Sequence, residues 1–139
     1  MTYRLLEHEA DIGIEASGKS LEEVFQDGAK AMFEVMADIE TIQLEKKVEI
    51  SCQADDIPTL FIEWLNQLLA EKDISYLLFS RFEVNIDHEG NIFTLHATAW
   101  GEEPDEEKHR LKTEVKAATY SGLEYKKNGE HIIRCVLDI

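Results

Sequence analysis

Two segments of the chain repeat apolar residues every three or four positions, the spacing of an amphipathic helix. The first opens with Ser20-Leu21-Glu22-Glu23, where a serine followed three residues later by a glutamate is typical of an N-terminal capping box. It predicts a helix over about residues 20–37. The second opens with Asp56-Ile57-Pro58, because aspartate caps free N–H groups and proline is tolerated in a first turn. It predicts a helix to about Glu71 or Lys72 that lies at the centre of the core.

The rest of the chain mostly alternates apolar and polar residues with the period of a β-strand. The predicted strands cover residues 3–6, 12–16, 47–52, 82–86, 93–99, 111–117, 123–127 and 132–137. Glu89-Gly90-Asn91 predicts a turn, and Asn128-Gly129 is the strongest two-residue hairpin signal in the chain. Helices early and strands late predict an α+β fold, a single domain over residues 1–139 with two main helices packed on a largely antiparallel β-sheet structure.

Length and composition narrow the classes of protein. With 139 residues and 44% hydrophobic residues, the chain can bury one core but not two. It has no run of 18 or more apolar residues, and its charged N-terminus lacks the apolar region of a secretory signal. We therefore expect no membrane span and a cytoplasmic location. Cys52 and Cys135 have neither CxxC nor zinc spacing, and two reduced cysteines fit a cytosolic protein better than a disulfide.

Charge is the strongest compositional feature. Fourteen basic residues against 29 acidic residues leave a net charge of −15. A surface with this much negative charge repels a polyanion. We therefore expect no direct binding of nucleic acid. It suits a basic protein partner or a metal cation, although most of these charges are expected to serve solubility. The acidic run 102–107 fits either a solvated face or a surface for a basic protein.

Carboxylates gather near both ends of the chain. Glu7, Glu9 and Asp11 share one face of an extended strand, where they repel one another unless they are solvated or share a cation. Asp138 adjoins the α-carboxylate of Ile139 at the end of an apolar strand. Each group alone also fits an ordinary solvated surface. If the two groups meet, their oxygens would suit calcium, magnesium or manganese.

Six short motifs in order along the chain resemble the archease family, and the similarity covers essentially the whole sequence. They are His8-Glu9-Ala10-Asp11-Ile12-Gly13, Ser20–Glu23 with Ala31-Met32-Phe33, Glu63-Trp64-Leu65-Asn66, Trp100-Gly101-Glu102 with Lys108-His109, Lys116-Ala117-Ala118-Thr119-Tyr120, and Asp138-Ile139. The resemblance implies a small, non-catalytic protein that assists the tRNA-splicing RNA ligase. Archeases promote guanylylation of that ligase and its multiple-turnover joining of 3′-phosphate or 2′,3′-cyclic phosphate ends to 5′-hydroxyl ends.

By the same resemblance, a divalent metal falls on Asp11, Asp138 and Ile139, the last through a main-chain oxygen. Calcium is the expected ion, with magnesium and manganese as alternatives. His8, Lys116 and His109 are the residues expected to contact the partner.

Two positions depart from the family pattern. Glu9 stands where the family has threonine, and Ser121 stands where a histidine commonly follows Thr-Tyr, so no role is carried onto Ser121. The alternative function is a chaperone or specificity modulator of tRNA-modifying enzymes, such as tRNA methyltransferases, with a structural metal. A metal-dependent hydrolase is disfavoured, because the sequence offers no clear nucleophile, general base or paired-metal cluster.

Overall fold

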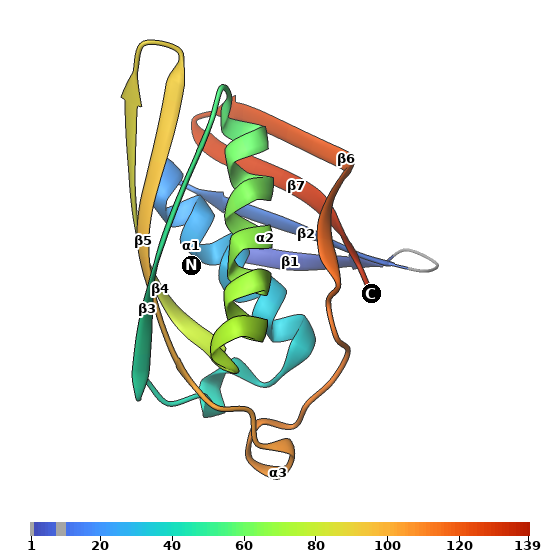
Figure 1. The fold of residues 1–139 in the computed structure, drawn as a ribbon. Helices are drawn as coiled ribbons and strands as arrows, with labels where there is room; N and C mark the ends of the chain where they lie inside the picture. Colours follow the sequence, from blue (N-terminus) through green and yellow to red (C-terminus); the bar gives the residue numbers. More distant parts are fainter. Residues whose placement is uncertain (1, 8–10) are drawn as a thin grey trace.

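Two antiparallel sheets enclose two helices in the computed structural model, which describes residues 2–7 and 11–139 (Figure 1). The helical elements are α1 (Leu21–Met36), η1 (Ile39–Thr41), α2 (Ile57–Ser75) and α3 (Glu106–His109). The strands are β1 (Thr2–Glu7), β2 (Asp11–Gly18), β3 (Lys46–Ala54), β4 (Leu78–Glu89), β5 (Ile92–Glu102), β6 (Ala117–Asn128) and β7 (Glu130–Asp138). The predicted α+β class with two main helices on antiparallel strands is confirmed.

The strands divide into a four-stranded sheet, in the order β1-β2-β7-β6, and a three-stranded sheet, in the order β3-β5-β4. Helix α1 packs against β2 and β4, and α2 packs against β3 and β6, so each helix contacts both sheets (Figure 1). This arrangement joins the first and last strands of the chain, because β7 inserts between β2 and β6. The division into two sheets was not predicted from the sequence.

Both predicted helix starts are confirmed. The Ser20 hydroxyl accepts the Glu23 N–H at 3.2 Å, and the Asp56 carboxylate accepts the Thr59 N–H at 2.8 Å. Glu23 differs from a capping box in one respect, because its carboxylate accepts the N–H of Lys19 and not that of the capping serine. Helix α2 also continues to Ser75, about a turn beyond its predicted end.

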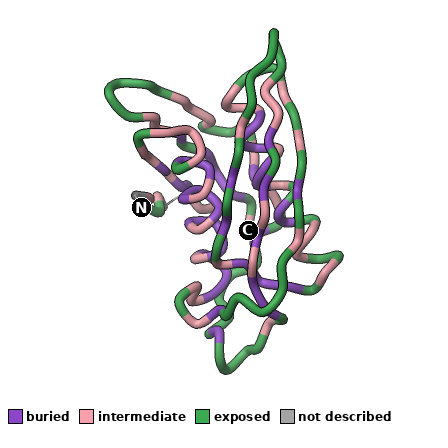
Figure 2. The backbone as a smooth tube through the Cα atoms, turned by 90° about the vertical axis from the view of Figure 1, so that its left-hand side faces the viewer, coloured by how far each residue is buried: buried purple, intermediate pink, exposed green. Residues whose placement is uncertain are grey.

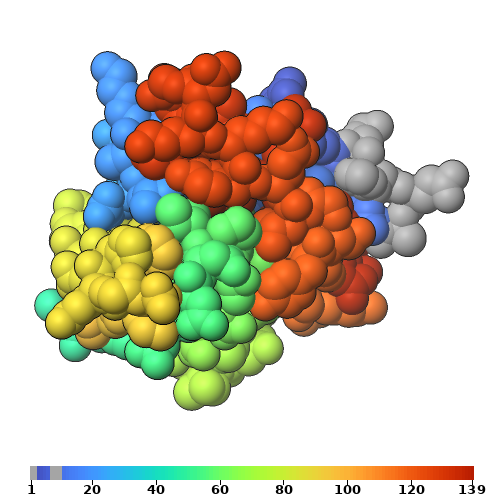
Figure 3. Space-filling model, turned by 90° about the horizontal axis from the view of Figure 1, so that it is seen from above, coloured from blue at the N-terminus to red at the C-terminus, as the bar shows by residue number. Residues whose placement is uncertain are grey.

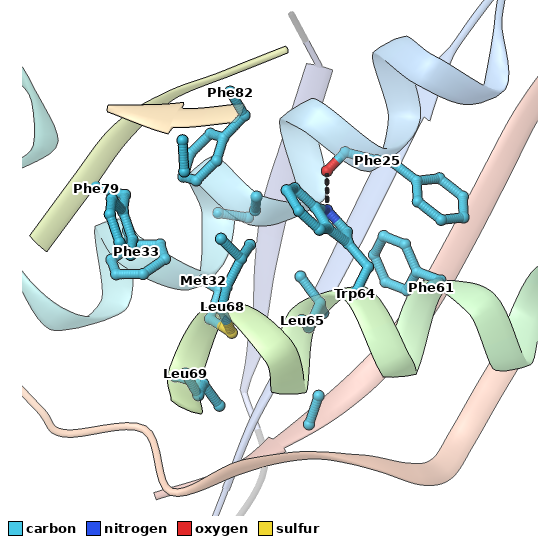
Figure 4. Close-up of a cluster of buried hydrophobic side chains, with 14 of the residues drawn as sticks. Phe25, Met32, Phe33, Phe61, Trp64, Leu65, Leu68, Leu69, Phe79 and Phe82 are labelled. Atoms are coloured by element: carbon cyan, nitrogen blue, oxygen red, sulfur yellow. Dashed lines mark hydrogen bonds between the residues drawn. The ribbon is translucent and has the colours of Figure 1, made fainter. Parts of the chain in front are cut away.

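The core lies between the helices, with Trp64 of α2 fully buried at its centre (Figure 4). The Trp64 indole N–H donates to the Phe25 carbonyl oxygen at 2.9 Å, and its ring meets the Phe82 ring edge-on at 6.0 Å. Gly28 of α1 lets Phe61 of α2 pack closely against the α1 backbone, since a Cβ atom at Gly28 would lie 2.5 Å from the Phe61 ring. Figure 2 shows the buried positions gathered inside and the exposed ones along the hairpin ends.

The two predicted turns are present. Gly90 and Gly129 adopt φ values of +61° and +79°, which glycine tolerates, at the tips of the β4–β5 and β6–β7 hairpins. These hairpins and the start of α2 lie at one end of the molecule, seen from above in Figure 3. The cysteines are not joined, because Cys52 lies on β3 and Cys135 on β7 of the other sheet.

The predicted strand over residues 111–117 is wrong, because β6 begins only at Ala117. The preceding segment runs across the end of α1 instead. The Lys112 N–H donates to the Met36 carbonyl at 2.8 Å, and the Thr113 N–H donates to the Val35 carbonyl at 3.4 Å. A helix leaves its last carbonyls unsatisfied, so Lys112 and Thr113 cap α1 and do not pair with a strand.

No helix in the described part of the chain is both long and apolar enough to span a membrane.

Replacing Trp64 with alanine should lower the free energy of unfolding by about 3–5 kcal/mol, the range for deleting a large buried aromatic side chain. The change also leaves the Phe25 carbonyl without the indole donor. Chemical denaturation of the purified protein measures the loss. Trp100→Ala is the matched control, because Trp100 is only half-buried and stacks on Arg81 at 5.2 Å. Equal losses for the two tryptophans would contradict the central position of Trp64.

Candidate functional site

The pairing of β2 with β7 sets Asp11 directly opposite Asp138. Cross-strand partners in a sheet point to the same face, with Cβ atoms about 4.5–5.5 Å apart. The face is the outer one, because Ile12, Ile14 and Leu137 at the alternate positions pack on the core. Two of the three sequence-predicted metal ligands are therefore immediate neighbours in space. Figure 1 shows the C-terminus beside the beginning of β2.

The neighbouring strand fixes the position of Asp138 from its other side. Ala117 of β6 is the register partner of Asp138, and the Lys116 N–H donates to the Asp138 carbonyl at 2.7 Å. Ile139, the third predicted ligand, is half-buried and packs against the core. The exposed side chain of Lys116 therefore starts from the same end of the sheet as the two aspartates.

Further along β6 the pairing with β7 is interrupted between Thr119 and Glu124. The intervening residues 120–123 bulge, and Gly122 adopts a φ of +65° over the side chain of Val136. Ser121 lies in this bulge with its side chain exposed. The structure thus sets Ser121 apart from the regular end of the sheet that carries Asp138.

His109 lies away from the aspartates, in α3, and its side chain is fully buried. Its ring Nδ1 accepts the Asp105 N–H at 2.9 Å, and its Nε2 lies 2.9 Å from the Glu102 carboxylate. Because Nδ1 is an acceptor, the proton of the neutral ring sits on Nε2 and is donated to Glu102. The imidazole was predicted to contact the partner, but in this structure it holds the loop 102–109 together.

Glu102 is a buried carboxylate with three donors. It accepts the Gln43 N–H at 2.7 Å, the Lys108 ammonium at 2.9 Å and the ring N–H of His109. Burial by itself raises the pKa of Glu102, but these hydrogen bonds outweigh it and hold the pKa at about 2. Sequence reasoning noted Glu102 and His109 only as parts of one motif, and their hydrogen bond is the physical reason for that pairing.

The predicted residues thus fall into two groups. Asp11, Asp138, Ile139 and Lys116 meet at one end of the four-stranded sheet, and His109 lies in the loop near η1. His8 and Glu9 fall outside the described residues. Within residues 2–7 and 11–139, no three side chains of His, Cys, Asp or Glu form a group that could hold a metal. A metal at the aspartate pair would need main-chain oxygens or water as further ligands.

Glu102→Gln should destabilise the protein at neutral pH by about 1–3 kcal/mol, because it removes the charge that satisfies several buried donors. The carboxylate's folded pKa lies below its unfolded value, so its contribution is present above about pH 4.5 and is lost as the pH falls towards 2. The difference in melting temperature between wild type and variant should therefore shrink on acidification.

Glu103→Gln is the matched control, since the Glu103 side chain is exposed and pairs with Lys46 at 3.4 Å. It should follow the wild type at every pH. A Glu102→Gln variant as stable as this control at neutral pH would contradict the buried network.

The sequence profile of the archease protein family (MTH1598/TM1083) matches residues 3–139. The chain is 43% identical to protein archease of Sulfolobus acidocaldarius and 41% identical to that of Sulfurisphaera tokodaii, in each case over 99% of this chain and 98% of the relative.

A solved structure has the same fold. The solution structure of Methanobacterium thermoautotrophicum protein 1598 aligns with a TM-score of 0.86 and 35% identity, covering 99% of this chain and 98% of that one. The profile matches nearly the whole sequence, the relatives align over almost their full length, and the fold is shared. This chain therefore belongs to the archease family.

Proposed function

We propose that this protein is a non-catalytic, metal-binding activator of the tRNA-splicing RNA ligase. It promotes guanylylation of the ligase and multiple-turnover joining of 3′-phosphate or 2′,3′-cyclic phosphate ends to 5′-hydroxyl ends, in the cytoplasm. Membership of the archease family supports the proposal. The observation that carries it is the cross-strand pair of Asp11 and Asp138.

This pair is unfavourable unless something compensates for it. Like charges directly opposite each other in a sheet are destabilising. Both aspartates nevertheless lie on the same outer face at the end of the β2–β7 pairing. A shared cation would turn this repulsion into attraction, so the arrangement has a physical reason if the pair binds a metal.

The donor set suits a hard divalent cation. Asp11 and Asp138 offer carboxylate oxygens, and Ile139 would add a main-chain oxygen. Calcium takes six to eight oxygen ligands and accepts water among them, whereas zinc prefers nitrogen and sulfur. Calcium therefore fits this site best, with magnesium or manganese as alternatives. A bound ion would supply a local positive charge that attracts the phosphate oxygens of a partner's substrate or nucleotide.

A backbone hydrogen bond holds the strands together at this end of the sheet. The bond from the Lys116 N–H to the Asp138 carbonyl fixes the last strand against β6. The same bond holds the backbone of Lys116 at this end of the sheet. In this proposal the Lys116 ammonium binds an anionic group brought by the partner. His109 acts at a distance from this site, by holding the loop 102–109.

Asp11→Ala and Asp138→Ala should each abolish metal binding and ligase activation while the fold survives. The fold should survive because each change removes one of two repelling charges and leaves the core untouched. Calcium titration by calorimetry, circular dichroism, ligase guanylylation and multiple-turnover ligation measure the effects. Asp87→Ala, an exposed aspartate on β4 of the other sheet, is the control and should behave as wild type.

Two results would point elsewhere. Folded Asp11 and Asp138 variants that still activate the ligase would eliminate the site. Variants that unfold would favour the alternative function, a chaperone or specificity modulator of tRNA-modifying enzymes with a structural metal.

The isolated protein should bind tRNA no better than an acidic protein of similar size. Binding to a polyanion is driven by cations that displace counterions, and this chain carries a net charge of −15. Filter binding with labelled tRNA at about 50 mM and about 200 mM salt tests this, since counterion release makes such affinity depend strongly on salt. Tight, salt-sensitive binding by the chain alone would contradict action through a protein partner.

A further inference from the structure

Two hollows adjoin at Pro104, and neither is lined by Asp11 or Asp138. The first is a hollow of about 350 Å³ between the end of α2 and the segment after α3. Its apolar lining comes from Met36, Tyr76, Leu78, Pro104 and Leu111, and its polar lining from Lys72, Lys112, Thr113 and Glu114. Figure 1 shows α3 and its loop at the lower end of the molecule, below the end of α2. The C-terminus lies higher, beside the beginning of β2.

The rim of the apolar hollow exposes large apolar side chains. Tyr76 is 63% exposed and Leu111 is 43% exposed. Tyr76 also ends α2 in the left-handed region, with φ at +54°, where glycine or asparagine is the usual residue. Arg110, next to Leu111, has φ at +51°, and these two are the non-glycine residues of the described chain with positive φ. Both unfavourable backbone conformations thus flank one hollow, where they present Tyr76 and Leu111 to solvent.

The second hollow, of about 340 Å³, lies on the other side of Pro104 and is acidic. Its carboxylates come from Glu45, Glu102, Glu103 and Asp105, and only two lysines balance them. Those lysines are engaged, because Lys108 pairs with Glu102 and Lys46 pairs with Glu103. One carboxylate oxygen of Asp105 accepts the N–H groups of Glu107 and Lys108, and the residue keeps its charge. Glu45 and Asp105 therefore leave a net negative charge beside the apolar hollow.

We infer that these adjoining hollows form a docking surface for a segment of a protein partner that carries a large apolar side chain next to a lysine or arginine. The apolar side chain would enter beside Tyr76 and Leu111, and the cation would lie at Glu45 and Asp105. A second copy of this chain is a poor occupant, because it would bring another net charge of −15 against this one. The inference rests on the proposed function, in which the partner is the RNA ligase.

The test is titration of the purified ligase with the full-length protein. Tyr76→Asn/Leu111→Ser should raise the Kd at least about tenfold, as for apolar anchors at the centre of an interface. Asparagine tolerates the left-handed conformation, so the fold should survive. Ile74→Ser is the matched control, because Ile74 is 78% exposed on the same helix but does not line the hollow. It should change the Kd less than about twofold, the effect of a peripheral contact.

The acidic hollow has its own pair of variants. Glu45→Lys should weaken binding and reduce its dependence on salt, whereas Glu89→Lys, at the tip of the β4–β5 hairpin, should do neither. Asp138→Ala should still bind ligase that carries no nucleotide or RNA, because the phosphate oxygens that a bound ion would attract are then absent, and it should fail to activate the ligase. That result would separate docking from the metal site.

Three outcomes would overturn the inference. Normal binding by Tyr76→Asn/Leu111→Ser, with a wild type that binds and activates, would remove the docking surface and leave the proposed function intact. A wild type that neither binds nor activates the ligase would remove both. A wild type that sediments as a dimer and becomes monomeric in the double variant would assign the surface to a second copy of the chain.

Discussion

The antiparallel pairing of β2 with β7 is the constraint on which the rest of this structure depends. It runs in unbroken register from Asp11 opposite Asp138 to Gly18 opposite His131. It places the two strands at the centre of the four-stranded sheet, where β1 and β6 each gain a partner. Each helix packs against this sheet and against the three-stranded sheet, so both sheets cover its apolar residues. This pairing is what brings the first and last parts of the chain together.

The same pairing also sets two like charges opposite each other. The inner-facing residues, such as Ile14, Ile133 and Leu137, are fully buried and favour the register. The outer face ends with Asp11 opposite Asp138, two residues of like charge. A like-charged cross-strand pair costs on the order of 1 kcal/mol or less, whereas burying one large apolar side chain contributes about 1.5–3 kcal/mol. The core can therefore hold the two carboxylates together without a bound cation.

A second constraint shapes the segment that joins β5 to β6. The buried contact between Glu102 and His109 closes the loop that follows β5, and the Lys112 and Thr113 N–H groups cap α1. The chain between these two anchors carries Pro104 and Leu111, which line the apolar hollow. A buried charge that accepts three hydrogen bonds is thus what gives an otherwise irregular segment a defined surface.

Local patterns in the sequence determined most elements of this protein, because capping residues, apolar periodicity and the Asn128-Gly129 turn act over a few positions. The motifs that resemble archeases also singled out Asp11, Asp138 and the Glu102…His109 pair. Local pattern failed for residues 111–117, whose alternation is that of any extended chain. Whether such a chain joins a strand or caps a helix depends on which backbone groups it meets. Only the tertiary structure decided that choice, the division into two sheets and the meeting of Asp11 with Asp138, because each depends on contacts between residues far apart in the sequence.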